Sequence, residues 1–217
     1  NIDENELEQS FNNQKVHQVK PELSPLNDRE NAIPPLLAFN SCLMGMFIMA
    51  AYVFLDKKEG VIKAYAVTAS SVSQYLLSKV FVIMLTAAVS GLIILVPVMG
   101  VRINYALVLL LLLTSGFFSS VLGLLIASFY KDITKAFGTI FFILILMVVP
   151  AISYFLPGWN PVWVKFIPSE PIIQGFKEII SINSSMAYTL FTSAGFLIAG
   201  VLLFFVTEFR FKKTLSL

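Results

Sequence analysis

Five long stretches of this chain contain no charged residue, and they restrict the possible folds more than any other feature of the sequence. The 15 basic and 13 acidic residues leave uncharged windows at 31–55, 80–101, 103–130, 136–164 and 179–207. Each window exceeds the roughly 20 apolar residues that a helix needs to cross a bilayer. None alternates polar and apolar residues as a membrane barrel strand would. The windows therefore predict helices, whose backbone polar groups are satisfied internally.

The composition agrees with a membrane protein, because 57% of the residues are hydrophobic and only 13% are charged. We predict an all-α integral membrane protein whose transmembrane permease domain occupies residues 34–217, with spans at about 34–55, 80–100, 104–129, 136–156 and 184–207. The single cysteine, Cys42, is expected to be a small buried side chain, since it has no partner for a disulfide. The lone His17 is expected to be a solvated residue of the polar tail rather than a metal ligand.

Two runs of small residues predict close helix contacts. Ser41 and Gly45 are four residues apart in the first window, and a similar stripe in the third window consists of Ser115, Ser119, Gly123 and Ala127. Small side chains let two membrane helices approach closely. The first pair fits packing within one subunit or a dimer contact, and the second stripe fits tight packing or the lining of a translocation route.

Basic residues give the expected orientation, because lysine and arginine collect on the cytoplasmic side of membrane proteins. Nine of them fall on one side, in the loops after the first and third spans and in the C-terminal tail: Lys57, Lys58, Lys63, Lys79, Lys131, Lys135, Arg210, Lys212 and Lys213. Six fall on the other side: Lys15, Lys20, Arg29, Arg102, Lys165 and Lys177. We therefore expect a cytoplasmic C-terminus and an outside polar tail at residues 1–33. Because that tail carries no apolar export signal, we expect a further helix before Asn1, which would give six spans in the parent chain.

The charged segment between the first two spans, residues 56–79, is the feature from which the rest can be oriented. Gly60 separates two helical patterns: Val61, Ile62, Tyr65 and Ala69 on one side, and Val72, Tyr75, Leu76 and Val80 on the other. We expect this segment to lie in water at the foot of two spans, as a short surface helix followed by a bend and the approach to the second span. The spacing alone fits a plain interfacial connector equally well.

The same segment resembles a loop of the ABC type-two exporter permeases. The resemblance lies in Glu59-Gly60, in Val67-Thr68-Ala69-Ser70-Ser71 and in Gln74-Tyr75-Leu76-Leu77-Ser78-Lys79, and it extends in order and spacing over residues 34–213. The chain departs from the family pattern at Ala69, where proline is usual, and at Val72, where a basic residue is common. The resemblance implies a coupling helix that docks on a cytoplasmic ATPase, with coupling residues Glu59, Gly60, Ile62, Tyr65, Thr68, Ser71 and Lys79.

A second short segment precedes the last span. Pro157-Gly158-Trp159-Asn160-Pro161 is a turn signal, and Ser169 followed by Pro171 marks a helix start. Ile172, Ile173, Phe176, Ile179 and Ile180 then form one apolar face, so we expect a helix that lies at, or dips into, the outer leaflet. The resembled family has a re-entrant helix here, which implies such a role for residues 161–180 and in particular for Pro168, Glu170, Pro171 and Phe176.

The chain offers no energy source of its own. It lacks a phosphate-binding loop of the type Gly-x-x-x-x-Gly-Lys-Ser/Thr, and no acidic, histidine or lysine residue lies inside a span. The resemblance implies a non-enzymatic exporter subunit in a prokaryotic cell membrane, surrounded by lipid and paired with a second, identical or different, permease subunit. ATP and magnesium would bind to a separate ABC ATPase, the cargo would be lipophilic or amphipathic (a drug, antibiotic, lipid or peptide), and no nucleic acid is expected as a partner. The alternatives are a membrane scaffold that recruits a partner without nucleotide and an ion-coupled carrier.

Overall fold

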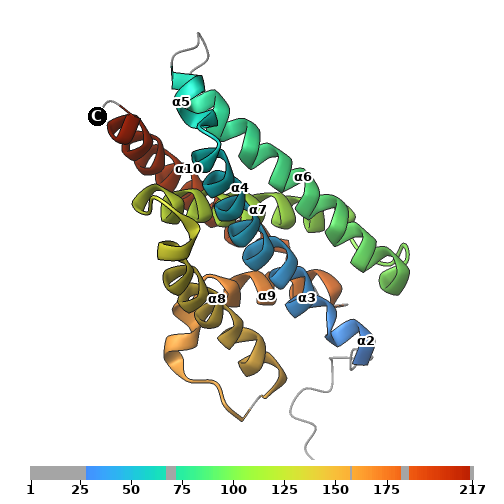
Figure 1. Cartoon of the computed structure of the whole chain (residues 1–217). Helices are drawn as coiled ribbons and strands as arrows, with labels where there is room; N and C mark the ends of the chain where they lie inside the picture. The colour runs from blue at the N-terminus through green and yellow to red at the C-terminus, as the bar shows by residue number, and fades with distance from the viewer. Residues whose placement is uncertain (1–27, 67–71, 157, 182–185, 216–217) are drawn as a thin grey trace, which may run out of the picture.

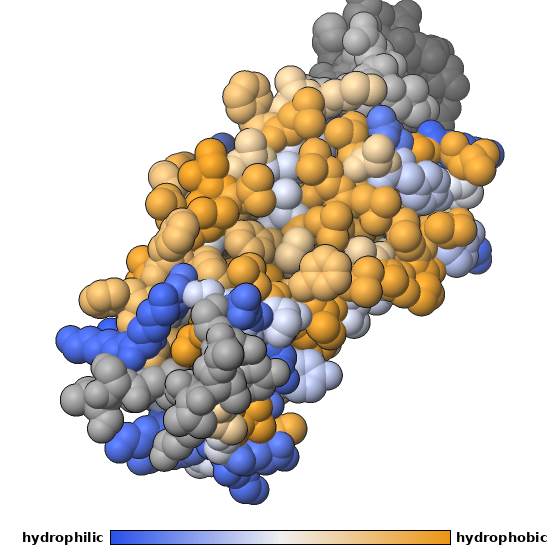
Figure 2. All heavy atoms as spheres, turned by 90° about the horizontal axis from the view of Figure 1, so that it is seen from above, coloured by the Kyte–Doolittle hydropathy of each residue, from blue (hydrophilic) through white to orange (hydrophobic). Residues whose placement is uncertain are grey.

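The structure is a computed structural model that describes residues 28–66, 72–156, 158–181 and 186–215, and within these ranges every regular element is helical. Five helical stretches are long and apolar enough to cross a membrane: Asp28–Lys58, Val72–Met99, Tyr105–Phe129, Ile133–Phe155 and Met186–Lys213. On the face shown in Figure 2, hydrophobic residues cover the middle and hydrophilic residues gather toward the ends. The predicted all-α membrane fold with five spans is confirmed.

The first span is built from several helical pieces that follow one another (Figure 1). They are α2 (Asp28–Asn31), α3 (Ile33–Ala38), the π-helix η1 (Phe39–Met44) and α4 (Gly45–Lys58). Pro34 and Pro35 stand in the first turn of α3, where the missing N–H groups do no harm. Residues 28–33 were expected to belong to a polar tail, but Asp28–Asn31 forms a helix and α3 begins at Ile33. His17 and the tail before Asp28 lie outside the described residues.

Side-chain caps define the start of two further spans. The Asn104 side chain accepts hydrogen bonds from the backbone N–H groups of Ala106 and Leu107, at 3.1 and 3.3 Å, and so begins α7 (Tyr105–Phe129). The Asp132 carboxylate accepts one from the N–H of Lys135 at 3.0 Å and begins α8 (Ile133–Phe155). Each cap satisfies N–H groups that the helix itself leaves without a partner.

Helix α7 lies at the centre, and the small residues of the sequence explain how its neighbour approaches it. A Cβ atom added at Gly123 would lie 2.4 Å from the carbonyl oxygen of Met46, so the backbones of α4 and α7 touch there. One turn away, Ser119 Oγ donates to the Ser41 carbonyl at 2.6 Å, and a Cβ at Gly45 would meet Ser119 Oγ at 2.7 Å. The prediction of close packing by these small residues is confirmed, and the contact lies within one subunit.

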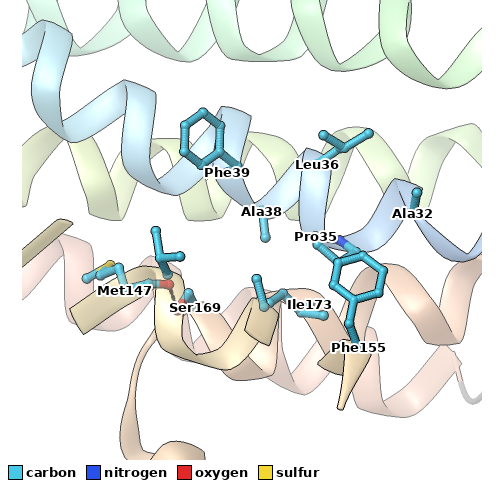
Figure 3. A pocket seen from close by; sticks show the side chains of 11 residues that line it. Ala32, Pro35, Leu36, Ala38, Phe39, Met147, Phe155, Ser169 and Ile173 are labelled. Atoms are coloured by element: carbon cyan, nitrogen blue, oxygen red, sulfur yellow. Dashed lines mark hydrogen bonds between the residues drawn. The ribbon is translucent and has the colours of Figure 1, made fainter. Parts of the chain in front are cut away.

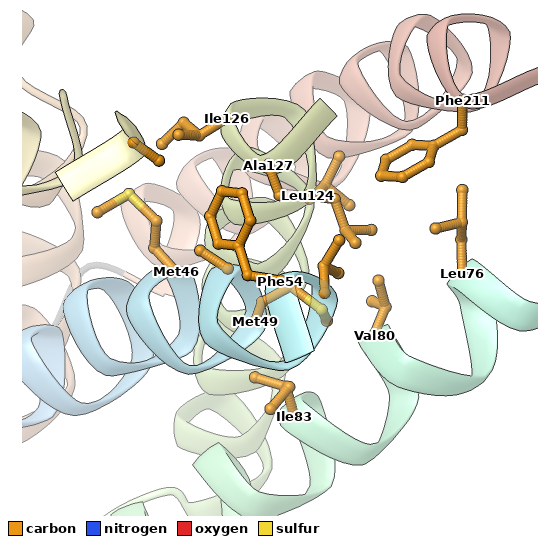
Figure 4. Close-up of a cluster of buried hydrophobic side chains, with 14 of the residues drawn as sticks. Met46, Met49, Phe54, Leu76, Val80, Ile83, Leu124, Ile126, Ala127 and Phe211 are labelled. Carbon is orange, nitrogen blue, oxygen red and sulfur yellow. The ribbon is translucent and has the colours of Figure 1, made fainter. Parts of the chain in front are cut away.

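The second and last spans are the longest single helices, α6 (Val72–Met99) and α10 (Met186–Leu215). Three short elements complete the fold: α5 (Val61–Ala66), the 3₁₀ helix η2 (Val162–Phe166) and α9 (Ser169–Ile180). One cluster of buried side chains joins α4, α6, α7 and α10 (Figure 4). A second cluster joins α3, α7 and α9. Leu122, Ile143, Leu144 and Leu203, which are partly buried, pack against both clusters.

Candidate functional site

The predicted coupling segment begins with a sharp change of direction at Gly60. Helix α4 continues through Lys58, Glu59 caps it, and Gly60 adopts φ 75°, after which α5 begins at Val61. Glycine enters this left-handed region without the steric cost that a Cβ imposes. Residues 67–71 lie outside the described part of the chain, and α6 begins at Val72. We call this end of the bundle the Gly60 end.

A buried carboxylate connects the two helices that flank α5. Asp56, near the end of α4, is 7% exposed and accepts a hydrogen bond from the hydroxyl of Tyr75 on α6. The ammonium of Lys79, one turn further along α6, lies 2.9 Å from the same carboxylate oxygen and 5.7 Å from the ring centres of Tyr52 and Tyr75. A carboxylate that is buried needs such partners, since removing one of them leaves an uncompensated charge. The end of α4 and the start of α6 are thus held together.

Lys57 connects the same end of α4 to α7. Its ammonium donates to the carbonyl oxygens of Ala127 at 2.5 Å and Tyr130 at 2.7 Å. Both carbonyls belong to the C-terminal end of α7, where the helix leaves its acceptors unsatisfied and where its dipole favours a cation. The ammonium also lies 5.5 Å from the ring centre of Phe54 and 5.6 Å from that of Phe211 on α10. Lys57 therefore acts as the C-terminal cap of the central helix.

Helix α10 is tied to the same end by a third set of contacts. Ser73, at the start of α6, donates to the carboxylate of Glu208, which also pairs with Lys212 one turn along α10. The guanidinium carbon of Arg210 lies 3.9 Å from the ring centre of Phe129, at the last residue of α7. At this end of the bundle, α4, α6, α7 and α10 are each attached to at least one other helix by a polar or cation–π contact.

Polar and cation–π contacts thus join the ends of α4, α6, α7 and α10. Packed side chains, ion pairs and hydrogen bonds are contacts through which one part of a protein can be coupled to another. Among the described residues, no three histidine, cysteine, aspartate or glutamate side chains lie close enough together to hold a metal ion.

The predicted coupling residues differ in their exposure and in their contacts. Glu59 is exposed at the end of α4, Ile62 is buried in the α4–α6–α7 cluster, and Lys79 takes part in the Asp56 ion pair. Tyr65 lies in α5, but its side chain is outside the described part of the chain, as are Thr68 and Ser71.

One part of the expectation for this segment is wrong. Asp56 does not lie in water, because helix α4 continues through Lys58 and buries Asp56 against α6. The helical pattern predicted from Val72 agrees with the structure, in which α6 begins at Val72 and continues into the second span. The physical reason is the Asp56–Lys79 pair, which lets charged residues extend the two helices side by side.

The α9 segment forms where the sequence places it. Pro168 immediately precedes α9, Glu170 and Pro171 lie in its first turn, and Phe176 is completely buried. The apolar face packs mainly against α3 and α10 and also against α8 and α7, where a Cβ added at Gly175 would meet Leu111. Helix α9 thus runs across the bundle at the end opposite Gly60 (Figure 1). Burial raises the pKa of the Glu170 carboxyl, and a hydrogen bond from Gln174 and the charge of Lys165 oppose that rise.

Next to α9 lies an apolar cavity of about 280 Å³ between the first and fourth spans (Figure 3). Its walls come from α3 and η1 on one side, α8 on the other and α9 as the floor. The lining residues are Ala32, Pro35, Leu36, Ala38, Phe39, Met147, Val148, Ala151, Phe155, Ser169 and Ile173. No periodicity in the sequence predicts this cavity, because its walls are drawn from three separate segments.

Other residues of interest also escape the sequence analysis. Asn40 lies in the π-helix η1, donates to the Ala87 carbonyl at 3.1 Å and accepts from Ser90 Oγ at 2.9 Å, which ties the first span to α6. A single amide in an uncharged window is a signal that could have drawn attention to Asn40. The opposite charges of Asp56 and Lys79 at the two ends of one loop could have suggested their pairing, whereas nothing in the sequence indicates the carbonyl partners of Lys57.

Comparison with known proteins agrees with this architecture. The sequence model of a family described as ABC-2 family transporter protein matches residues 3–207. No curated protein and no solved structure gave a match. The family match covers most of the chain, and the five apolar spans are those of a multi-pass membrane component. The chain therefore belongs to the ABC-2 transporter family.

Proposed function

We propose that this chain is the permease subunit of an ATP-driven exporter that moves a lipophilic or amphipathic molecule across the cell membrane. The observation that supports it best is the set of contacts at the Gly60 end, where Asp56 and Lys57 attach both flanks of α5 to the rest of the bundle. Proteins of the ABC-2 family generally pair with a cytoplasmic ABC ATPase. We place that ATPase on residues 59–71, and hence the Gly60 end on the cytoplasmic side.

In this proposal, the ATPase supplies the energy and the permease converts a displacement of α5 into a change of the bundle. Nucleotide binding draws two ATPase subunits together and moves α5, whose flanking helices are joined by the Asp56–Lys79 pair. Because Lys57 holds the end of α7, the central helix must move with α4 or lose its cap. The proposal also requires a second permease subunit, so that a path for the cargo can open between the two helix bundles.

The experiment is purification of the chain from its native membrane in mild detergent, followed by measurement of ATP hydrolysis by whatever soluble subunit accompanies it. Reversal of an exposed charge beside the hinge, Glu59→Arg, is expected to reduce both co-purification and hydrolysis several-fold. The matched control is Arg102→Glu, an exposed charge reversal in the hairpin after α6, at the other end of the bundle. This control is expected to change neither.

Two results would contradict the proposal. A Glu59→Arg chain that retains its ATPase and full hydrolysis would remove the docking role of residues 59–71. A wild-type chain that retains a soluble partner with no nucleotide hydrolysis would instead favour a membrane scaffold.

A further inference from the structure

The cavity beside α9 has a closed floor and an open rim. Ser169 in the floor and Ala38 in the α3 wall are both 2% exposed, whereas Leu36, Phe39 and Phe155 at the rim are about half exposed. The rim residues belong to α3, η1 and α8, which are parts of candidate membrane spans. The cavity therefore opens sideways, on the surface that the hydrocarbon of a bilayer would cover.

The lining offers an occupant apolar surface with no free hydrogen-bonding group among the side chains. The one polar side chain is that of Ser169, and its hydroxyl donates to the Met147 carbonyl at 2.6 Å. Apolar cavities of this kind stay dry and accept hydrocarbon, since a water molecule would need two to four polar partners. An engineered cavity of about 150 Å³ holds benzene, so a cavity of about 280 Å³ has room for roughly ten carbon atoms.

The shape of the cavity favours a chain over a compact molecule. Its walls run from Ala32 to Phe39 along the first span and from Phe155 back to Met147 along the fourth (Figure 3). Seven residues of helix correspond to a length of about 10 Å. The two spans run in opposite directions, so Ala32 and Phe155 share one end and Phe39 and Met147 share the other.

Polar groups gather at the Ala32–Phe155 end. Tyr154, next to the lining residue Phe155, donates its hydroxyl to the Asn31 side chain at 2.7 Å, and Asn31 precedes the lining residue Ala32. The ammonium of Lys177, one turn after Ile173 on α9, lies 5.4 Å from the centre of the Tyr154 ring. We call Asn31, Tyr154 and Lys177 the polar collar. The cavity thus has an apolar body and a hydrogen-bonding end, which matches the two parts of an amphiphile.

We propose that this cavity binds the alkyl chain of an amphiphile, with the polar head at the collar. The inference deepens the function proposed above and rests on it only where it concerns cargo, because a resident membrane lipid would offer the same chain. The alkyl chain fills the space between α3, α8 and α9, and the head group remains beside Tyr154 and Lys177. If the cavity binds the alkyl chain of the amphiphile, the affinity should depend on the length of that chain.

The test uses the full chain purified in digitonin, a detergent whose apolar part is a rigid steroid rather than an alkyl chain. Alkylphosphocholines with 6 to 14 carbons are titrated, and binding is read from the rise in the thermal unfolding midpoint. Each added methylene is expected to raise affinity about fourfold, from about 0.8 kcal/mol per buried methylene, until the cavity is full near ten carbons. Beyond that length, affinity should rise no further.

Two phenylalanine substitutions on α8, one inside the cavity and one beside it, provide a test variant and its control. Ala151→Phe places a ring in the cavity and is expected to lower the affinity of the ten-carbon compound about tenfold or more. Ile152→Phe adds a ring at the adjacent position on α8, which is 47% exposed and lies outside the lining, and should bind like wild type. Should Ala151→Phe fail to fold, Ala32→Leu narrows the opposite wall and takes its place.

The outcomes separate this inference from the proposed function. Affinity that is independent of chain length, or equal in Ala151→Phe and Ile152→Phe, overturns the alkyl-chain site even if ATP hydrolysis is coupled to the chain. Chain-length dependence lost in Ala151→Phe supports the site even if no ATPase is ever found. Vesicles that contain the complete complex then assign the source: ATP-dependent uptake of the ten-carbon compound identifies cargo, and binding without uptake identifies a resident lipid.

Discussion

Replacement of Lys57 by methionine removes the contact that joins the coupling segment to the centre of the bundle. The change deletes two hydrogen bonds, to the Ala127 and Tyr130 carbonyl oxygens, and the cation that lies near the rings of Phe54 and Phe211. Methionine retains most of the aliphatic stem and can contact the same rings through sulfur. The substitution therefore tests the charge and its hydrogen bonds more than the packing.

The expected cost follows from typical contributions of such bonds. A hydrogen bond to a charged group contributes about 1.5–3 kcal/mol, and the two carbonyls together would lose about 3 kcal/mol at the low end of that range. Because Lys57 is only half-buried, water can reach the vacated carbonyls and restore part of that loss. We expect Lys57→Met to lower the free energy of unfolding by about 2 kcal/mol, which is about a 30-fold change in the folded-to-unfolded ratio.

The adjacent residue supplies the control. Lys58 is exposed, so Lys58→Met should change the free energy of unfolding by less than about 0.5 kcal/mol. Both variants can be unfolded in mixed micelles of a mild and a denaturing detergent, with helix content measured against denaturant fraction. Equal stability of the two variants would refute the capping role of Lys57, and with it the mechanical link between α4 and α7.

Two further predictions concern the α4–α7 contact and α9. Gly123→Ala should destabilise the fold by about 1–3 kcal/mol in the same unfolding assay, because the new Cβ would overlap the Met46 carbonyl and force α4 and α7 apart. The control is Gly138→Ala, which has open space around the new Cβ and should leave the free energy of unfolding unchanged. If Gly138→Ala were the more destabilised variant, the backbones of α4 and α7 would not be in contact. Burial raises the pKa of Glu170 in the folded state, so the wild type loses stability as pH rises through that pKa. Glu170→Gln carries no such charge. It should therefore stabilise the chain at neutral pH and not below about pH 4. A pH-independent difference between wild type and Glu170→Gln would argue against this account.

The sequence determined the elements of this protein. Transfer of each uncharged window from water to hydrocarbon is a property of that window alone, which is why five spans could be predicted without knowledge of their partners. The apolar face of α9 and the small residues at Gly45 and Gly123 were also predicted, since helical periodicity places their side chains on one face. All of these features are local to one segment.

Only the tertiary structure decided which segments meet. Asp56 was expected in water and is buried, because Tyr75 and Lys79 of another helix compensate its charge. The apolar face of α9 is visible in the sequence, but its packing partners α3, α7, α8 and α10 are not. The cap at Lys57 joins residues about 70 positions apart. Such pairings depend on the shapes and hydrogen bonds of surfaces that are brought together by packing, and hydropathy along the chain carries no record of them.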